Sequence, residues 1–132
     1  FLVLSLNLSY AGTSCKGTTN FKILAVSQNN LESRGDLVNA KISLINGPQN
    51  VIMVTPPYAG TSTQKSITNA LKSLNITNCD ALFKITDNQT NEVDGPSAGI
   101  MFSIVLYGLY HNIIIPSNIY ATGEVDNKGN VK

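Results

Sequence analysis

Apolar and polar positions alternate along much of this 132-residue chain, with the spacing of strands in some segments and of helices in others. Runs rich in Val, Ile, Leu and Phe, bounded by turn-forming residues, predict strands at residues 21–27, 37–45, 51–55, 81–86 and 118–125. The Asn-Gly-Pro turn at residues 46–48 separates the second strand from the third. The pattern therefore predicts a mixed α/β domain.

Two segments have helical spacing. The first helix has apolar positions three or four residues apart, at Ile67, Ala70, Leu71 and Leu74. We expect Thr61 or Ser62 to cap it. A longer apolar run at residues 97–110 predicts a mostly buried second helix, and residues 56–60 and 87–92 are expected to be loops.

Residues 1–20 allow two interpretations. Leucines alternate with Ser and Asn over residues 4–10, which is the pattern of an extra strand. The same apolar run, followed by Ala11 and Gly12, is also typical of the end of a signal peptide. We expect one domain over residues 21–132, and we expect it to be incomplete at its C-terminal end because residues 127–132 stop within a predicted hairpin.

Composition excludes several function classes. The formal net charge is only +1, without a basic run, which argues against a nucleic-acid partner. No apolar stretch reaches transmembrane length, no phosphate-binding loop is present, and the two cysteines are too few for a zinc site. We expect no metal and no organic cofactor.

The two cysteines and three glycosylation sequons bear on location. Cys15 and Cys79 either form a disulfide or remain free thiols. Sequons begin at Asn7, Asn75 and Asn88. With the signal-like start, these features favour an extracytoplasmic protein, secreted or tethered to a membrane, and a cytoplasmic location is the alternative.

One short motif carries candidate chemistry. Residues 94–99 read Asp-Gly-Pro-Ser-Ala-Gly and lead directly into the apolar helix. The motif presents Ser97 at a helix start, where free N–H groups, such as those of Ser97 and Ala98, can stabilise an oxyanion. Ser97 is therefore a candidate nucleophile, and the alternative is that it simply caps the helix.

Ser97 would need a base. His111 is the only histidine, and on a continuous helix it lies roughly 21 Å from Ser97, which excludes a Ser-His-Asp triad within the chain. A lysine with a pKa lowered by burial is the remaining choice. Ser62 and Lys65 have the Ser-x-x-Lys spacing of penicillin-recognising enzymes, but the other signatures of that class are missing.

The motif at residues 94–99 resembles the nucleophile motif of the Lon proteases, which use a Ser–Lys dyad. Further similarity lies at residues 120–125, Tyr-Ala-Thr-Gly-Glu-Val, which resemble a Thr-Gly-Glu strand of that family. Residues 64–70 resemble the first helix of the family, and the turn at residues 46–48 also fits. The resemblance covers roughly residues 21–132.

This resemblance implies an α+β fold, the Lon proteolytic-domain fold similar to the second domain of ribosomal protein S5, with a mixed sheet and packed helices. It implies a serine endopeptidase of the archaeal, stand-alone type, with Ser97 as nucleophile. Asp94 and Thr122 would support the site, and the dyad lysine would lie beyond Lys132. Lys128 corresponds to a basic residue in a turn of the family.

The expected partners are peptides or unfolded proteins. Assembly into a homo-oligomer and a separate ATPase partner both remain open. The rival hypothesis is a non-catalytic assembly or peptide-binding module that keeps the same fold.

Overall fold

The computed structural model describes residues 14–28, 33–53, 59–87 and 95–132. Its elements, in chain order, are β1 (Thr18–Gln28), β2 (Ser33–Asn46), β3 (Val51–Met53), α2 (Thr61–Ser73), β4 (Cys79–Ile85) and α3 (Gly99–Tyr110). The protein is therefore α+β, as the sequence predicts.

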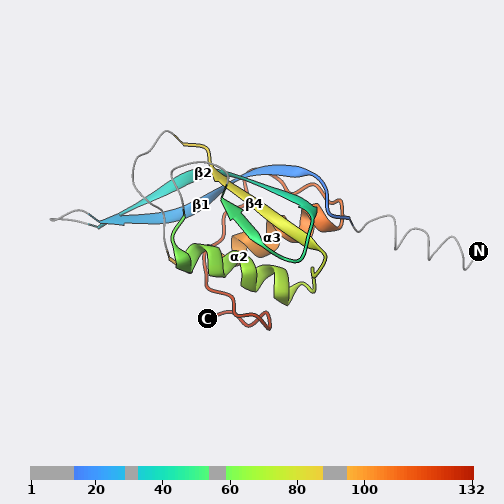
Figure 1. Ribbon diagram of the computed structural model, residues 1–132. Helices are drawn as coiled ribbons and strands as arrows, with labels where there is room; N and C mark the ends of the chain where they lie inside the picture. The colour runs from blue at the N-terminus through green and yellow to red at the C-terminus, as the bar shows by residue number, and fades with distance from the viewer. Residues whose placement is uncertain (1–13, 29–32, 54–58, 88–94) are drawn as a thin grey trace, which may run out of the picture.

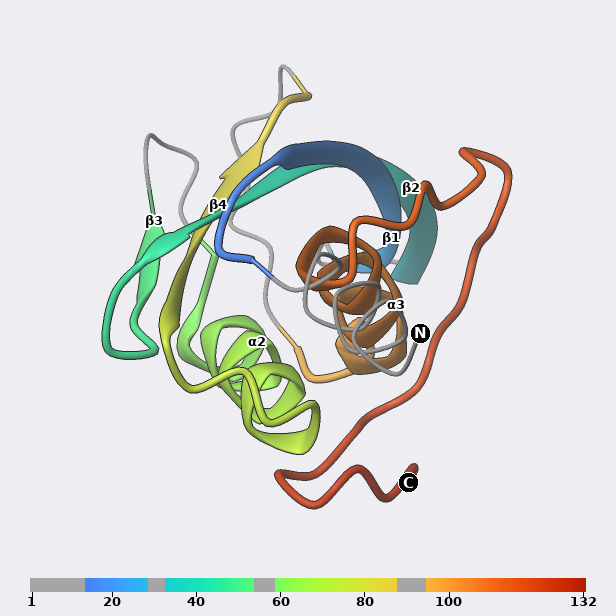
Figure 2. The same cartoon turned by 90° about the vertical axis from the view of Figure 1, so that its right-hand side faces the viewer.

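The four strands form one mixed sheet in the order β1-β2-β4-β3. β1 and β2 make a long antiparallel hairpin, β2 also pairs antiparallel with β4, and the short β3 runs parallel to β4. Figures 1 and 2 show that α2 and α3 lie together on one face of the sheet, which curves around α3. The expected mixed sheet with packed helices is confirmed.

The core lies between this sheet face and the two helices. Alternate residues of the strands are buried there, as period-two patterning requires: Phe21 and Ile23 in β1, Val38, Ala40, Ile42 and Leu44 in β2, and Ala81, Phe83 and Ile85 in β4. Three phenylalanines meet at its centre, with the Phe102 ring of α3 5.9 Å from that of Phe21 and 5.4 Å from that of Phe83. Both contacts are edge-to-face, the geometry that aromatic pairs favour.

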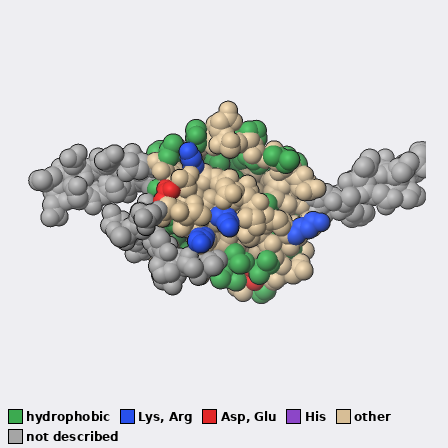
Figure 3. All heavy atoms as spheres, turned by 90° about the horizontal axis from the view of Figure 1, so that it is seen from above, with side chains coloured by type: hydrophobic (Ala, Val, Ile, Leu, Met, Phe, Trp, Pro, Cys, Tyr) green, Lys and Arg blue, Asp and Glu red, His purple; other side chains and the backbone are tan. Residues whose placement is uncertain are grey.

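The opposite face of the sheet is mixed, with polar side chains and the exposed Leu24, Leu37, Ile45 and Ile52. Viewed over the strands, it shows scattered lysine side chains among other polar groups (Figure 3). Lys41 and Lys84 occupy neighbouring positions on β2 and β4. The helices therefore cover only the face that carries the buried side chains.

The two helix starts differ from the prediction. α2 is capped by Gly60, without a side-chain cap, so neither Thr61 nor Ser62 caps it. The helix begins one residue earlier than a Thr61 cap would allow and two earlier than a Ser62 cap would allow. The Gln64 N–H donates to the Gly60 carbonyl (3.0 Å). α3 begins at Gly99, two residues after the predicted start, because residues 96–98 form a turn.

The predicted strand at residues 118–125 is wrong. Only Val125 in this segment has a β-bridge, to Val131, and no strand of the sheet lies beside it. The segment instead runs along the start of α3, where its backbone groups bond to α3 and to the turn before it. Those partners replace the ladder that a strand would need.

Cys15 and Cys79 form a disulfide that spans 64 residues of sequence. Cys79 begins β4, and the neighbouring Ser14 N–H donates to the carbonyl of Tyr110 at the end of α3 (2.9 Å). The disulfide therefore fixes the chain before β1 to the sheet, and the Ser14 hydrogen bond fixes it to the C-terminal end of α3. Within the described ranges, no helix has the length and apolar character needed to span a membrane.

Candidate active site

Ser97 lies in the turn that leads into α3, and its side chain is exposed while Ala98 and Gly99 behind it are buried. The N-cap residue of α3 is Ala98, and no side chain caps the helix. The Ser97 hydroxyl therefore does not serve as the cap that the alternative interpretation required. It also makes no hydrogen bond with any residue that the structure describes.

The residues around Thr122 hold the Ser97 turn from one side. The Gly123 N–H donates to the Ser97 carbonyl (2.7 Å), and the Thr122 hydroxyl donates to the same oxygen (3.2 Å). The Ile100 N–H in turn donates to the Gly123 carbonyl (3.0 Å). The segments that resemble the two Lon motifs, 25 residues apart in sequence, are thus joined by a closed set of hydrogen bonds.

Two glycines make this approach possible. A Cβ on Gly99 would lie 2.9 Å from the Val125 nitrogen and 3.2 Å from the Gly123 carbonyl oxygen. Gly123 has a φ of +150°, which side chains rarely adopt, and a Cβ there would collide with the Ile100 side chain. Small residues at both positions are needed for the backbones to pack together.

Helix α2 holds the same turn from the other side. The Thr63 hydroxyl donates to the Gly95 carbonyl (3.2 Å), and the Ser66 hydroxyl donates to the carbonyls of Pro96 (3.3 Å) and Ser62 (3.1 Å). Both hydroxyl residues are buried. Neither residue was predicted from the sequence. The available signal was their helical spacing from Ile67 and Ala70, which places two polar side chains on the buried face of α2, where they need hydrogen-bond partners.

The expected oxyanion donors are unpaired within the described ranges. Neither the Ser97 N–H nor the Ala98 N–H has a hydrogen-bond acceptor there, and the next amide, that of Gly99, donates to the Pro96 carbonyl (3.3 Å). The positive end of the α3 dipole lies at this point, and the first turn of α3 carries no acidic residue. An anion forming beside Ser97 would find free donors.

His111 lies far from Ser97. α3 is continuous over 12 residues, about 18 Å, and His111 is the C-cap at its far end. Its ring packs against Tyr107 (4.3 Å between centroids) and Tyr110 (5.4 Å). The expectation that His111 cannot serve Ser97 as a base is confirmed by this geometry.

The described lysines near the site make no hydrogen bond with the Ser97 hydroxyl either. A polar pocket of about 360 Å³ begins at Pro96 and includes Lys65 and Lys132 in its lining. No described lysine forms a hydrogen bond with the Ser97 hydroxyl. Ser62, the other half of the Ser-x-x-Lys pair, lines the same pocket, and no hydrogen bond joins its hydroxyl to Lys65 in the described structure.

The far wall of this pocket is a tight turn near the end of the chain. Asp126 accepts hydrogen bonds from the backbone and side chain of Asn130 and from the Lys128 N–H, all within 3.0 Å. These bonds, those from Asn130 first, lower the pKa of the Asp126 carboxyl. Lys128 thus lies in a turn, and the Lys132 N–H bonds to the Glu124 carbonyl (2.9 Å).

Asp94, the second expected support of the site, lies outside the described residues. Within them, no three residues of the His, Cys, Asp and Glu types gather as metal ligands would. No model of a protein family matches the chain, and no curated protein matches it. The case for an activity therefore rests on the motifs and on the geometry around Ser97.

Proposed function

We propose that this chain is a Lon-like serine endopeptidase domain in which Ser97 is the nucleophile. The observation that carries the proposal is the set of hydrogen bonds that joins the turn of Ser97 to Thr122 and Gly123. It brings the two segments that resemble Lon motifs together and leaves the serine hydroxyl exposed and unused. A serine that only capped the helix would have its oxygen bonded to the first turn of α3.

The proposed reaction is acyl transfer to serine followed by hydrolysis. The Ser97 oxygen attacks the carbonyl carbon of a peptide bond as a lysine amine accepts its proton. The N–H groups of Ser97 and Ala98 stabilise the oxyanion that forms, the amine of the leaving peptide takes the proton, and water then releases the acyl group. By resemblance the lysine lies beyond Lys132, with the Thr122 hydroxyl beside it and Asp94 orienting the loop.

The fold in this proposal is that of the Lon proteolytic domain. An α+β domain with a mixed sheet and both helices on one face is compatible with it. The substrates are peptides or unfolded proteins, reached from the exposed side of Ser97.

We place this peptidase outside the cytoplasm. The Cys15–Cys79 disulfide supports that location, because such bonds persist in oxidising compartments. The sequon at Asn75 is compatible with it, since the Asn75 and Thr77 side chains are exposed. The sequons at Asn7 and Asn88 lie outside the described residues.

The decisive experiment is Ser97→Ala in the full-length protein. We expect hydrolysis of a fluorogenic casein substrate to be abolished while the melting temperature stays almost unchanged, because the Ser97 side chain is exposed and unbonded. Ser117→Ala, which alters another exposed serine beyond the far end of α3, is the matched control and should leave turnover intact.

Undiminished turnover in the Ser97→Ala variant would refute the assignment. A wild-type protein that binds casein peptides without cleaving them, with the same affinity as Ser97→Ala, would instead identify the non-catalytic peptide-binding module.

A further inference from the structure

The C-terminal end of α3 closes with a regular turn that nevertheless exposes apolar side chains. The Ile113 N–H donates to the Gly108 carbonyl (2.7 Å) and the Asn112 N–H to the Leu109 carbonyl (3.3 Å), with Asn112 at a φ of 56°. This pairing is a Schellman motif, in which the residue after the left-handed position normally packs back onto the helix. Here that residue is Ile113, and it is 49% exposed.

Helix α2 ends with the same motif and shows what is unusual about α3. Its left-handed residue is Asn75, and the following Ile76 N–H donates to the Leu71 carbonyl (2.9 Å). Ile76 is completely buried, whereas Ile113 is half exposed and the next residue, Ile114, is 93% exposed. The motif itself therefore does not require an exposed isoleucine. The position in α3 that corresponds to Leu71 is Gly108, which has no side chain for Ile113 to contact, and the Ile115 side chain covers it.

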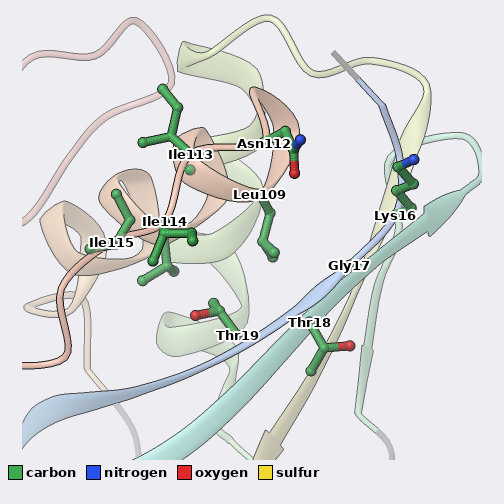
Figure 4. Close-up of a pocket in the computed structure, with 11 residues that line it drawn as sticks. Lys16, Gly17, Thr18, Thr19, Leu109, Asn112, Ile113, Ile114 and Ile115 are labelled. Carbon is green, nitrogen blue, oxygen red and sulfur yellow. The ribbon is translucent and has the colours of Figure 1, made fainter. Parts of the chain in front are cut away.

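The exposed isoleucines border a hollow of about 350 Å³. Figure 4 shows Leu109 and Ile113–Ile115 from α3 and its following loop on one side, with residues 16–19 at the start of β1 on the other. Among the described residues that line it, Lys16 is the one charged residue and none is acidic. Apolar side chains therefore make up the larger part of this surface, together with Thr18, Thr19, Asn112 and the exposed Lys16.

The chain before β1 also reaches the body at this end. Ser14 bonds to Tyr110, the last residue of α3, and Cys15 is fixed by its disulfide. The residues that precede them in the sequence, 1–10, are apolar at most positions. Ser14, which follows this apolar segment in the sequence, therefore lies at the same end of the molecule as the two exposed isoleucines and Lys16.

We propose that this end of the protein, formed by Lys16, Leu109, Ile113 and Ile114, is a membrane-contacting surface that binds bilayers containing anionic phospholipid. The isoleucines insert at the boundary between headgroups and acyl chains, and Lys16 pairs with a lipid phosphate. Ser97 lies at the other end of α3, whose 12 residues are about 18 Å long, so the proposed lipid contact leaves it in solvent. The inference does not depend on the peptidase proposal.

The absence of tryptophan from the chain makes a direct test possible. In the full 132-residue chain, Ile114→Trp introduces a single fluorophore at the proposed contact. On addition of 3:1 phosphatidylcholine/phosphatidylglycerol vesicles we expect its emission to shift to the blue and to be quenched by brominated lipid. Leu37→Trp is the matched control, since Leu37 is 46% exposed but pairs with Leu24, about 20 Å further along β1 from Thr18. Its emission should not change.

Partitioning into the same vesicles provides the quantitative arm. Ile113→Ser/Ile114→Ser should weaken partitioning by about tenfold or more, because both side chains lose their transfer into lipid. Lys16→Gln should weaken binding about fivefold on the anionic vesicles and leave binding to pure phosphatidylcholine unchanged. Circular dichroism serves to confirm that each variant is folded.

Two results would overturn the proposal. If residues 1–10 alone hold the chain on vesicles, the fluorophore of Ile114→Trp will show neither shift nor quenching. If a second copy of the chain covers the surface, the shift will depend on protein concentration without vesicles, and Ile113→Ser/Ile114→Ser will convert a dimer to a monomer in light scattering.

Discussion

The two ends of α3 differ in what the backbone bonds to and in which side chains remain exposed. At the N-terminal end, backbone groups of the turn before α3 are bonded to α2 and to the segment around Gly123, and a hydroxyl is left exposed. At the C-terminal end, the helix closes on itself through Asn112 and leaves apolar side chains exposed. One end offers polar chemistry and the other offers an apolar surface.

This difference follows from the helix itself. The first N–H groups of a helix lack intrahelical partners and lie at the positive end of its dipole, so an anion or oxyanion is stabilised there. The last carbonyls can be satisfied by a left-handed residue, after which the chain leaves the helix. In α3 the side chains that follow are exposed because Gly108 has no side chain for Ile113 to contact. A single helix of 12 residues thus separates the proposed reaction site from the proposed lipid contact.

The largest effect that should distinguish the two ends comes from the disulfide. Cys15→Ala/Cys79→Ala opens a loop of 64 residues, and we expect the free energy of unfolding to fall by about 4 kcal/mol. Urea unfolding measures this loss. Native-state hydrogen exchange should show the Ser14 amide losing protection, while the Gly123 amide at the Ser97 end loses only what the global destabilisation requires. An equal additional loss of protection at the Ser14 and Gly123 amides would contradict the independence of the two ends of α3.

A second comparison uses the two glycines of α3. The Gly99→Ala Cβ would meet backbone atoms of Val125 and Gly123, so the bonded segments must move apart. Overpacking of this kind typically costs 1–3 kcal/mol, and we expect a net loss of about 1–2 kcal/mol together with loss of peptidase turnover. Thermal unfolding and the casein assay measure the two effects.

Gly108→Ala is the matched substitution at the other end. Its Cβ would lie 2.7 Å from the Ile115 side chain and 2.9 Å from the Ile113 carbonyl oxygen. We expect it to displace residues 113–115, the isoleucine loop, and hence to alter vesicle binding, with turnover unchanged. Loss of turnover in Gly108→Ala comparable to that in Gly99→Ala would show that the two ends are coupled.

The sequence predicted the sheet better than it predicted the surroundings of Ser97. Period-two alternation identified β1, β2 and β4 because each buries one face against the helices. It failed for residues 118–125, since an apolar and β-branched run carries no information on whether a neighbouring strand is available. There the backbone bonds are made to Ser97 and Ile100 instead.

The motif at residues 94–99 located the exposed serine, but the groups that hold it could not be found in the same way. Thr63 and Ser66 act through hydroxyl contacts with the carbonyls of Gly95 and Pro96, which are distant in sequence. The exposure of Ile113 and Ile114 was also hidden, because the buried Ile76 follows the same Asn-Ile pattern at the end of α2. Only the packing partner, Leu71 in one helix and Gly108 in the other, distinguishes them.

A smaller effect is expected at Thr122. Thr122→Val removes the hydroxyl donor to the Ser97 carbonyl but keeps the shape of the side chain and the Gly123 bond. The residue is exposed, so we expect about 0.5–1 kcal/mol of lost stability, with a larger proportional loss of turnover as the Ser97 turn loosens. Thr122→Ser restores the donor and should recover both. A Val variant with full turnover would remove Thr122 from the proposed site.

The smallest expected effect is a response to acid confined to the turn at residues 126–130, whose Asp126 lines the pocket that begins at Pro96. Hydrogen bonds from Asn130 and from the Lys128 N–H lower the pKa of Asp126, so its carboxylate stabilises the turn above the ordinary aspartate pKa. That contribution is lost as the pH falls through the lowered pKa of the folded state.

NMR titration should therefore show the Lys128 and Asn130 amides shifting at a pH below the ordinary aspartate range. Asn130→Ala should move that titration upward, because it removes the side-chain donor. The Asn112 and Ile113 amides at the other end of α3 should not titrate with Asp126, since no acidic residue lines the hollow beside them. A shared titration at both ends would show that the turn at residues 126–130 and the isoleucine loop move together.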